Sequence, residues 1–159
     1  MSDVEVRRAT VDDAEGIARV HIQVWRDTYS SMVEPGELDE LSVERRAERW
    51  RTHLAGDAEA WVAVVNAAIV GFARATTHDA QAVRPRELEA IYVLPEHHGT
   101  GIAQALLDAA IGDVPAFLFV ARGNPRATRF YERNGFAFDG ASEQYPLVRT
   151  PITSLRMVR

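Results

Sequence analysis

The sequence predicts an α/β fold in which helices and strands alternate irregularly along the chain. Runs typical of strands and helices follow one another in the order β-α-α-β-β-β-α-β-α-β-β. Two strand-like runs, 60–65 and 68–76, are separated only by Asn66-Ala67, which predicts an antiparallel hairpin. A third run, 116–121, is apolar throughout and predicts a fully buried strand. This order fits neither a doubly wound parallel sheet nor an all-antiparallel one.

Length and composition narrow the class of protein further. The chain has 159 residues, close to the roughly 150 expected of one domain, so we expect a single domain over residues 1–159. It contains no cysteine, which excludes disulfides, thiolate metal sites and a cysteine nucleophile. All 18 basic residues are arginine, which excludes a lysine Schiff base. The net charge of −5 argues against nucleic acid or an anionic membrane surface as the main partner.

The chain shows no sign of targeting to a membrane or the cell exterior. Its first ten residues lack the apolar stretch of a signal peptide. The longest apolar run, 60–65, is far shorter than the roughly 18 residues of a spanning helix. We therefore expect a cytoplasmic protein that does not act at a membrane.

Local signals place the individual elements. Alternating or apolar runs predict strands at 4–9, 60–65, 68–76, 87–94, 116–121, 136–138 and 152–158. Helical periodicity predicts one helix that ends near residue 29 and others at 42–54, 101–111 and 125–135.

Small polar residues mark the expected helix starts, because their side chains can accept hydrogen bonds from free backbone amides. Either Thr10 or Asp12 is expected to cap the first helix, Ser42 the second and Asn124 the fourth. Gly135 is expected to end the fourth helix in a left-handed conformation.

The strongest chemical signal is the run His98-Gly99-Thr100-Gly101-Ile102-Ala103, which links an expected strand to an expected helix. Glycines allow the backbone to approach a ligand, and the free amides of a helix start favour an anion such as pyrophosphate. The run does not fit a dinucleotide-binding fingerprint, because Gln104 occupies the third glycine position. It also lacks the GK[ST] of a P-loop. An ordinary helix-start turn is the alternative.

A second motif lies downstream and reads Asn124-Pro-Arg-Ala-Thr-Arg-Phe-Tyr-Glu-Arg-Asn-Gly-Phe136. Together the two motifs closely resemble the Gcn5-related N-acetyltransferase (GNAT) family, whose loop reads [Q/R]-x-x-G-x-[G/A] and whose later helix reads N-x-x-A-x-x-x-Y-x-x-x-G-F. The order of segments also matches, so the resemblance covers essentially the whole chain. It implies a mixed, mostly antiparallel sheet of about seven strands flanked by about four helices. His98 departs from the family pattern, which usually has Gln or Arg there.

The resemblance implies acetyl-CoA as the co-substrate and assigns roles to individual residues. Tyr131 would protonate the departing thiolate of CoA, which a phenol can do while un-ionised at neutral pH; aromatic packing is the alternative. Arg126 belongs to a basic stripe with Arg129 and Arg133 that either meets CoA phosphates or faces solvent. The residues assigned to the cofactor are Ile91, Val93, His98, Gly99, Thr100, Gly101, Ile102, Ala103, Asn124 and Arg126.

Four further side chains are candidates for the acceptor side. Glu87 and Glu89 lie two residues apart on an expected strand and so share a face, where each can raise the pKa of the other. The family often has a catalytic carboxylate here, and we favour Glu87 slightly as the base; a solvated strand face is the alternative. Trp25 and Tyr29 are either walls of the acceptor pocket or core residues. The five histidines show no ligand spacing, so we expect no metal.

We therefore expect an N-acetyltransferase that uses acetyl-CoA and a primary amine by direct attack in a ternary complex, since no cysteine is present for a covalent route. The acceptor is expected to be a small molecule. One alternative acceptor is a protein N-terminus or lysine, and an alternative function is a non-catalytic acyl-CoA-binding module. Dimerisation is common in the family, and the segment between Pro146 and Pro151 is a candidate contact for a homodimer.

Overall fold

The structure is a computed structural model that describes residues 3–159. Within this range seven strands form one sheet in the order β1-β2-β3-β4-β5-β7-β6. The strands are β1 Val4–Arg8, β2 Glu59–Val65, β3 Ala68–Thr77, β4 Arg86–Val93, β5 Ala116–Ala121, β6 Ala137–Pro146 and β7 Pro151–Val158. The helices are α1 Ala14–Tyr29, α2 Val43–Ala55, α3 Ile102–Ala110 and α4 Pro125–Arg133, with short 3-10 turns η1 Val11–Asp13, η2 Glu37–Glu40 and η3 Pro95–His97.

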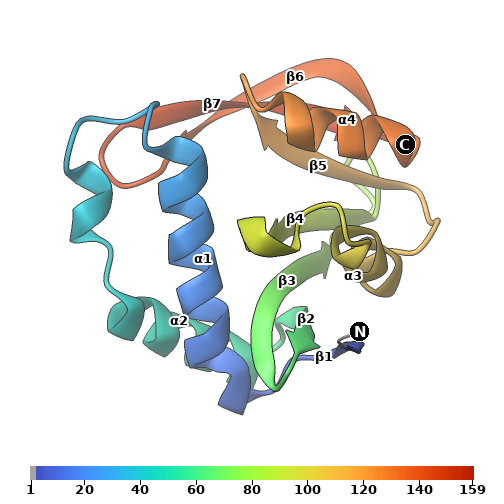
Figure 1. Cartoon of the computed structure of the whole chain (residues 1–159). Helices are drawn as coiled ribbons and strands as arrows, with labels where there is room; N and C mark the ends of the chain where they lie inside the picture. Colours follow the sequence, from blue (N-terminus) through green and yellow to red (C-terminus); the bar gives the residue numbers. More distant parts are fainter. Residues whose placement is uncertain (1–2) are drawn as a thin grey trace.

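Helices cover both faces of this sheet (Figure 1). The apolar stripes of α1 and α2 pack against β2 and β3 in one core cluster, which contains Ile17, Trp50 and Phe72. The stripes of α3 and α4 pack in a second cluster on the opposite face, around Leu106 and Leu118. Every adjacent pair of strands is antiparallel except β4 and β5. The expected mixed, mostly antiparallel sheet with flanking helices is confirmed.

The sheet opens in its centre, between β4 and β5. These strands pair at two positions only, Arg86 with Ala116 and Glu87 with Phe117, and then diverge (Figure 1). A bulge at Glu89 adds to the change of direction, because Leu88 and Ala90 pair with consecutive residues of β3. The second half of β4 therefore presents backbone groups to an opening rather than to a neighbouring strand.

Most expected caps are present. The Ser42 hydroxyl accepts a hydrogen bond from the Arg45 amide at 3.3 Å, and the Asn124 side-chain Oδ1 accepts one from the Ala127 amide at 3.3 Å. Gly135 follows α4 with a φ of +88°, the left-handed conformation expected of it.

The first helix begins differently, and Asp12 does not cap it. The chain passes through η1 before α1, and the Thr10 amide donates a hydrogen bond to the Asp13 carboxylate at 2.8 Å. Two further bonds from the Arg7 guanidinium, at 2.8 and 2.9 Å, hold the same carboxylate and lower its pKa. The helix start is thus fixed by a contact with β1 that lies outside the helix itself.

β6 is much longer than the expected strand at 136–138. It continues to Pro146 as the edge strand, with side chains that are almost all exposed. Its residues 139–146 include glycine, serine and proline, so no apolar alternation predicts a strand there. Pairing with β7, across an irregularity between Phe138 and Ser142, extends it.

The left-handed conformation of the β2–β3 turn can be tested by substitution. Asn66 and Ala67 have φ values of +51° and +65°, the left-handed geometry that favours Asn-Gly in two-residue turns. We expect Ala67→Gly to raise the free energy of unfolding by about 0.5–1 kcal/mol, because alanine is strained in this conformation. Urea unfolding measures the change. Ala58→Gly, at a position without positive φ, is the control and should not stabilise the protein; equal stabilisation by both variants would contradict the assignment.

Candidate active site

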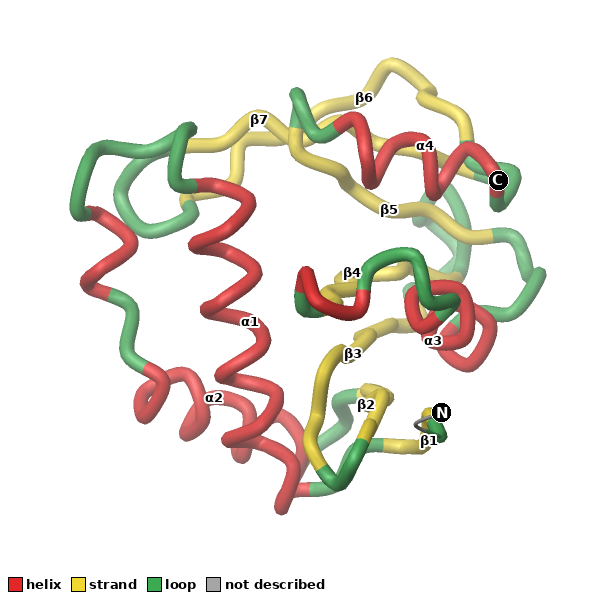
Figure 2. The backbone as a smooth tube through the Cα atoms, in the orientation of Figure 1, coloured by secondary structure: helices red, strands yellow, loops and turns green. Residues whose placement is uncertain are grey.

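A cavity of about 680 Å³ lies where β4 and β5 diverge. The C-terminal part of α1, the strands β4 and β5, the loop before α3 and the helix α4 form its walls. In Figure 2, α1 and α4 stand on different sides of this region, with β4 beside it. Of the residues assigned roles from the sequence, the cavity is lined by Tyr29, Glu89, Ile91, Val93, His98, Gly99, Gly101, Ile102, Ala103, Asn124, Arg126 and Tyr131. The fold therefore brings the two sequence motifs to one space.

The loop before α3 is shaped to receive an anion. Gly99 and Gly101 have φ values of +76° and +86°, and a Cβ built on either would meet nothing within 4 Å. No side chain caps α3, and its first turn carries no acidic residue. The first amides of this helix are thus free to bind a ligand oxygen, assisted by the positive end of the helix dipole.

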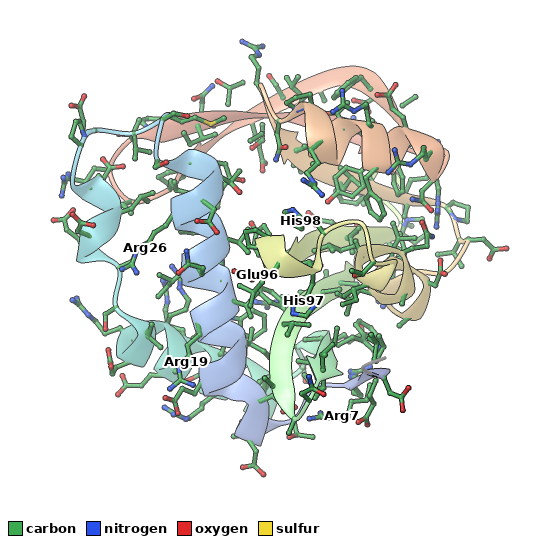
Figure 3. The ribbon with its side chains drawn as sticks, in the orientation of Figure 1. Arg7, Arg19, Arg26, Glu96, His97 and His98 are labelled. Atoms are coloured by element: carbon green, nitrogen blue, oxygen red, sulfur yellow. The ribbon has the colours of Figure 1, made fainter. Side chains whose placement is uncertain are left out.

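Two side chains of this loop stabilise the loop itself. The His98 Nε2 lies 3.0 Å from the Val93 carbonyl oxygen, and the Thr100 hydroxyl donates to the His97 carbonyl at 2.5 Å. Figure 3 shows His97 and His98 on the segment that joins β4 to α3. His98 lines the cavity, whereas Thr100 does not. The structure therefore gives no support to Thr100 as a side-chain ligand, and the His98 ring is engaged with β4.

The wall formed by α4 carries both a phenol and a row of cations. Tyr131 packs against Phe136 with ring centroids 6.1 Å apart, and burial raises the pKa of its hydroxyl above the ordinary value. The phenol therefore stays protonated and is able to act as a donor. Arg126, Arg129 and Arg133 all line the cavity, so the predicted basic stripe faces the site and not solvent alone.

Tyr29 and Tyr92 form the wall nearest to α1. Burial raises the pKa of Tyr29 to about 12 and also raises that of Tyr92. Trp25 does not line the cavity; it is 3% exposed, and its indole N–H donates to the Tyr92 hydroxyl at 3.2 Å. Trp25 is therefore a core residue that supports Tyr92. Tyr92 was not predicted as a site residue, although it stands between Ile91 and Val93.

The two candidate carboxylates have different partners. Glu89 lines the cavity, with its carboxylate 2.8 Å from the Arg74 Nε. Glu87 lies outside the lining, with its carboxylate 2.7 Å from the His78 Nε2. Burial raises the pKa of Glu87; the charge of Glu89 raises it further, and His78 opposes the shift. The effect of Glu89 on the pKa of Glu87 agrees with the predicted shared face, but no sequence signal pointed to His78 or Arg74 as partners.

Residues 3–159 contain no group of three or more His, Asp or Glu side chains placed to hold a metal ion. Within the same range no helix is long and apolar enough to cross a membrane.

A mixed sheet that parts beside a glycine-rich helix start with free amides is the arrangement expected from the resemblance to acyl-CoA-dependent acetyltransferases. Residues 22–136 match the model of the acetyltransferase (GNAT) family. Because the match covers well over half of the chain, the protein belongs to this family and is an acyl-CoA-dependent N-acetyltransferase. The resemblance stated from the two motifs is confirmed.

Individual relatives and solved structures agree with this family. A probable N-acetyltransferase of Mycobacterium tuberculosis is 27% identical over 167 positions, which cover 99% of this chain and 95% of that protein. YuaI of Bacillus subtilis, an uncharacterized N-acetyltransferase, is 33% identical over 107 positions, covering 65% of this chain and 60% of that protein.

Two solved structures show the same fold at low identity. The PaiA N-acetyltransferase of Thermoplasma acidophilum, solved in complex with coenzyme A, superposes with a TM-score of 0.76 at 20% identity and covers 97% of this chain and 98% of that one. YncA of Salmonella typhimurium, solved with acetyl-CoA, gives 0.70 at 17% identity, with coverage of 99% and 94%.

The open space at Gly101 makes the loop testable. A valine side chain there would enter the space where an anion would bind, and its left-handed φ would strain the loop. We expect Gly101→Val to weaken CoA binding at least about tenfold, measured by calorimetric titration. Gly112→Val places the same residue at a φ of +56° after the other end of α3 and should lower stability without changing CoA affinity. Parental affinity in Gly101→Val would disprove the assignment of the loop.

Proposed function

We propose that the protein transfers the acetyl group of acetyl-CoA to a primary amine of a small molecule, by direct attack while both substrates are bound. One observation carries this proposal: a single cavity joins an anion-binding helix start, a protonated phenol and a carboxylate. The complexes of PaiA with coenzyme A and of YncA with acetyl-CoA support the choice of co-substrate, since they share this fold.

The cofactor would enter along the opening between β4 and β5. The amides of Gly99, Gly101, Ile102 and Ala103 would bind the pyrophosphate, and Arg126 with its neighbours on α4 would balance the phosphate charge. The pantetheine arm contains amides of its own, and the backbone of β4 at Ile91 and Val93 lacks a β5 partner there. Asn124 lies at the end of the opposite wall. This arrangement would place the thioester beside Tyr131.

The reaction needs two proton movements. The neutral amine forms a bond to the acetyl carbon, and the carbon–sulfur bond then breaks to release CoA as a thiolate. Tyr131 would give its proton to the sulfur. The proton lost by the amine would pass to Glu87 through water, because Glu87 lies outside the cavity lining, or directly to Glu89.

The acceptor side of the cavity favours a small molecule over an extended peptide. The segment that contains η2 packs against the β6–β7 turn in a third core cluster that includes Trp25, Leu38 and Leu147. The buried Glu37 strengthens this contact, because it accepts a hydrogen bond from the Thr150 hydroxyl at 2.8 Å. Tyr29, which lines the cavity, packs against the same cluster, so a filled core lies behind its side of the cavity. Leu147 and Thr150 thus contact their own chain, and a homodimer through the segment from Pro146 to Pro151 stays a prediction.

A panel of amines with thiol release as the readout tests the function. Transfer to small amines would support the proposal, and transfer to peptide N-termini or lysines alone would replace the acceptor. CoA binding without release on any amine would favour a non-catalytic binding module.

The Tyr131 hydroxyl is the most specific part of the proposed chemistry. Tyr131→Phe retains the ring contact with Phe136, so melting temperature and CoA affinity should be close to parental. We expect kcat to fall by roughly 10²–10⁴, because the leaving thiolate loses its proton donor. Tyr145→Phe removes a hydroxyl from an exposed residue of β6 outside the cavity lining and serves as control. A near-parental kcat in Tyr131→Phe would exclude this tyrosine as the acid.

The raised pKa of Glu87 predicts a particular pH dependence. The base acts only when ionised, so kcat should rise as the pH passes upward through the raised pKa of this carboxyl. Glu87→Gln should reduce kcat mainly on the acidic side, because free amine becomes abundant in alkaline solution without a base. Glu89→Gln is the companion variant. If Glu87→Gln keeps the parental pH–rate profile and Glu89→Gln loses it, the base is Glu89.

A further inference from the structure

We propose that His78 is the proton outlet of the acceptor site: it takes from Glu87 the proton that the amine has lost and releases it to solvent. This inference rests on the proposed function and adds a residue that neither the two motifs nor the comparisons assign.

The contact between the two side chains is short and held from several directions. The His78 Nε2 lies 2.7 Å from the Glu87 Oε1. The His78 amide donates to the Pro85 carbonyl at 2.7 Å, which closes the β3–β4 loop directly behind the ring. The ring also packs against Phe117, with centroids 5.4 Å apart. Loop backbone and aromatic contact therefore fix the imidazole beside Glu87 before any substrate arrives.

The partners distinguish the two carboxylates. Glu89 is paired with Arg74, and a guanidinium cannot accept a proton from a protonated acid. Glu87 is paired with an imidazole, which has an acceptor nitrogen when neutral and ordinarily exchanges protons near neutral pH. A proton that reaches Glu87 can therefore move on to the neighbouring side chain, whereas the arginine paired with Glu89 cannot take one.

Exposure increases over the last step of the proposed route, from Glu87 to His78. Glu89 lines the cavity, and Glu87 follows one strand repeat away, roughly 7 Å along β4. The Glu87 side chain is 18% exposed and that of His78 is 37% exposed. The charged groups around Glu87 are Glu89 on its own strand, Glu143 on β6 and His78 on the loop. The negative charges of Glu89 and Glu143 favour uptake of a proton by Glu87. His78, on the β3–β4 loop, is the group through which that proton would leave.

The transfer is balanced without another reactant. Protonated Glu87 gives its proton to the Nε2 of neutral His78 and becomes a carboxylate again. The imidazolium then releases the proton of its Nδ1 to water or buffer. Exchange with solvent restores the original tautomer, so the pair is ready for the next acceptor.

A pair of substitutions in the full chain separates proton transfer from simple hydrogen bonding. His78→Gln keeps a donor next to Glu87 but cannot relay a proton. We expect its kcat to fall about tenfold to a hundredfold at neutral pH, with CoA affinity, the KM of the amine and melting temperature unchanged. His78→Ala leaves space at the site, and added imidazole should restore at least about a tenth of the parental kcat. His53→Ala, on α2, should retain parental kcat and show no response to imidazole.

A double variant tests whether Glu87 and His78 act on the same proton-transfer route. In the Glu87→Gln background, His78→Gln should cause no further loss, because the outlet then has nothing to carry. A parental kcat for His78→Gln at every pH and buffer concentration would overturn the proposal. So would a loss that neither imidazole nor concentrated buffer relieves, because a purely structural contact behaves in that way. Failure of the parent to acetylate any amine would instead refute the proposed function.

Discussion

The short pairing between β4 and β5 is the constraint on which the rest of the structure depends. The strands share two residue pairs and then separate, while β4 stays bonded to β3 and β5 to β7 along their lengths. The sheet thus consists of two halves, each paired within itself, that are joined to each other only by the short β4–β5 pairing. Backbone groups that would ordinarily complete a sheet face the opening, and such groups need water or a ligand as partners. The opening between β4 and β5 is therefore a property of the sheet, and the loop before α3 with the helices α1 and α4 completes the walls of the cavity.

Each wall of the cavity contributes a different kind of chemical group. The loop before α3 offers backbone amides, which bind an anion without a charged side chain. The helix α4 adds arginines and an un-ionised phenol, and β4 adds the carboxylate of Glu89. Positive charge is thus concentrated on the α4 wall, which favours a phosphate-bearing ligand there.

The sequence predicts the fold and the local backbone geometry of the two motifs well because their signals are local. Gly101, Asn124 and Gly135 each report on the conformation of their own segment, and the structure shows the expected geometry at all three. Contacts between distant segments were not predictable. Trp25 supports the cavity wall and is not part of it, because its indole N–H donates to the hydroxyl of Tyr92, and Tyr92 is the residue that lines the cavity. The partners of Glu87 and Glu89 depend on the β3–β4 register and its bulge, which no periodicity reveals. The long edge strand β6 likewise forms through pairing and not through propensity.

The contact of Glu37 with Thr150 joins two segments that lie far apart in the sequence. η2 and the β6–β7 turn meet at this buried carboxylate and its apolar surroundings. The C-terminal end of α1 packs in the same cluster through Trp25 and Tyr29. Because Tyr29 also lines the cavity, a change at the contact between the two segments would reach the cavity wall through α1. The position of that wall is thus coupled to segments that do not themselves line the cavity.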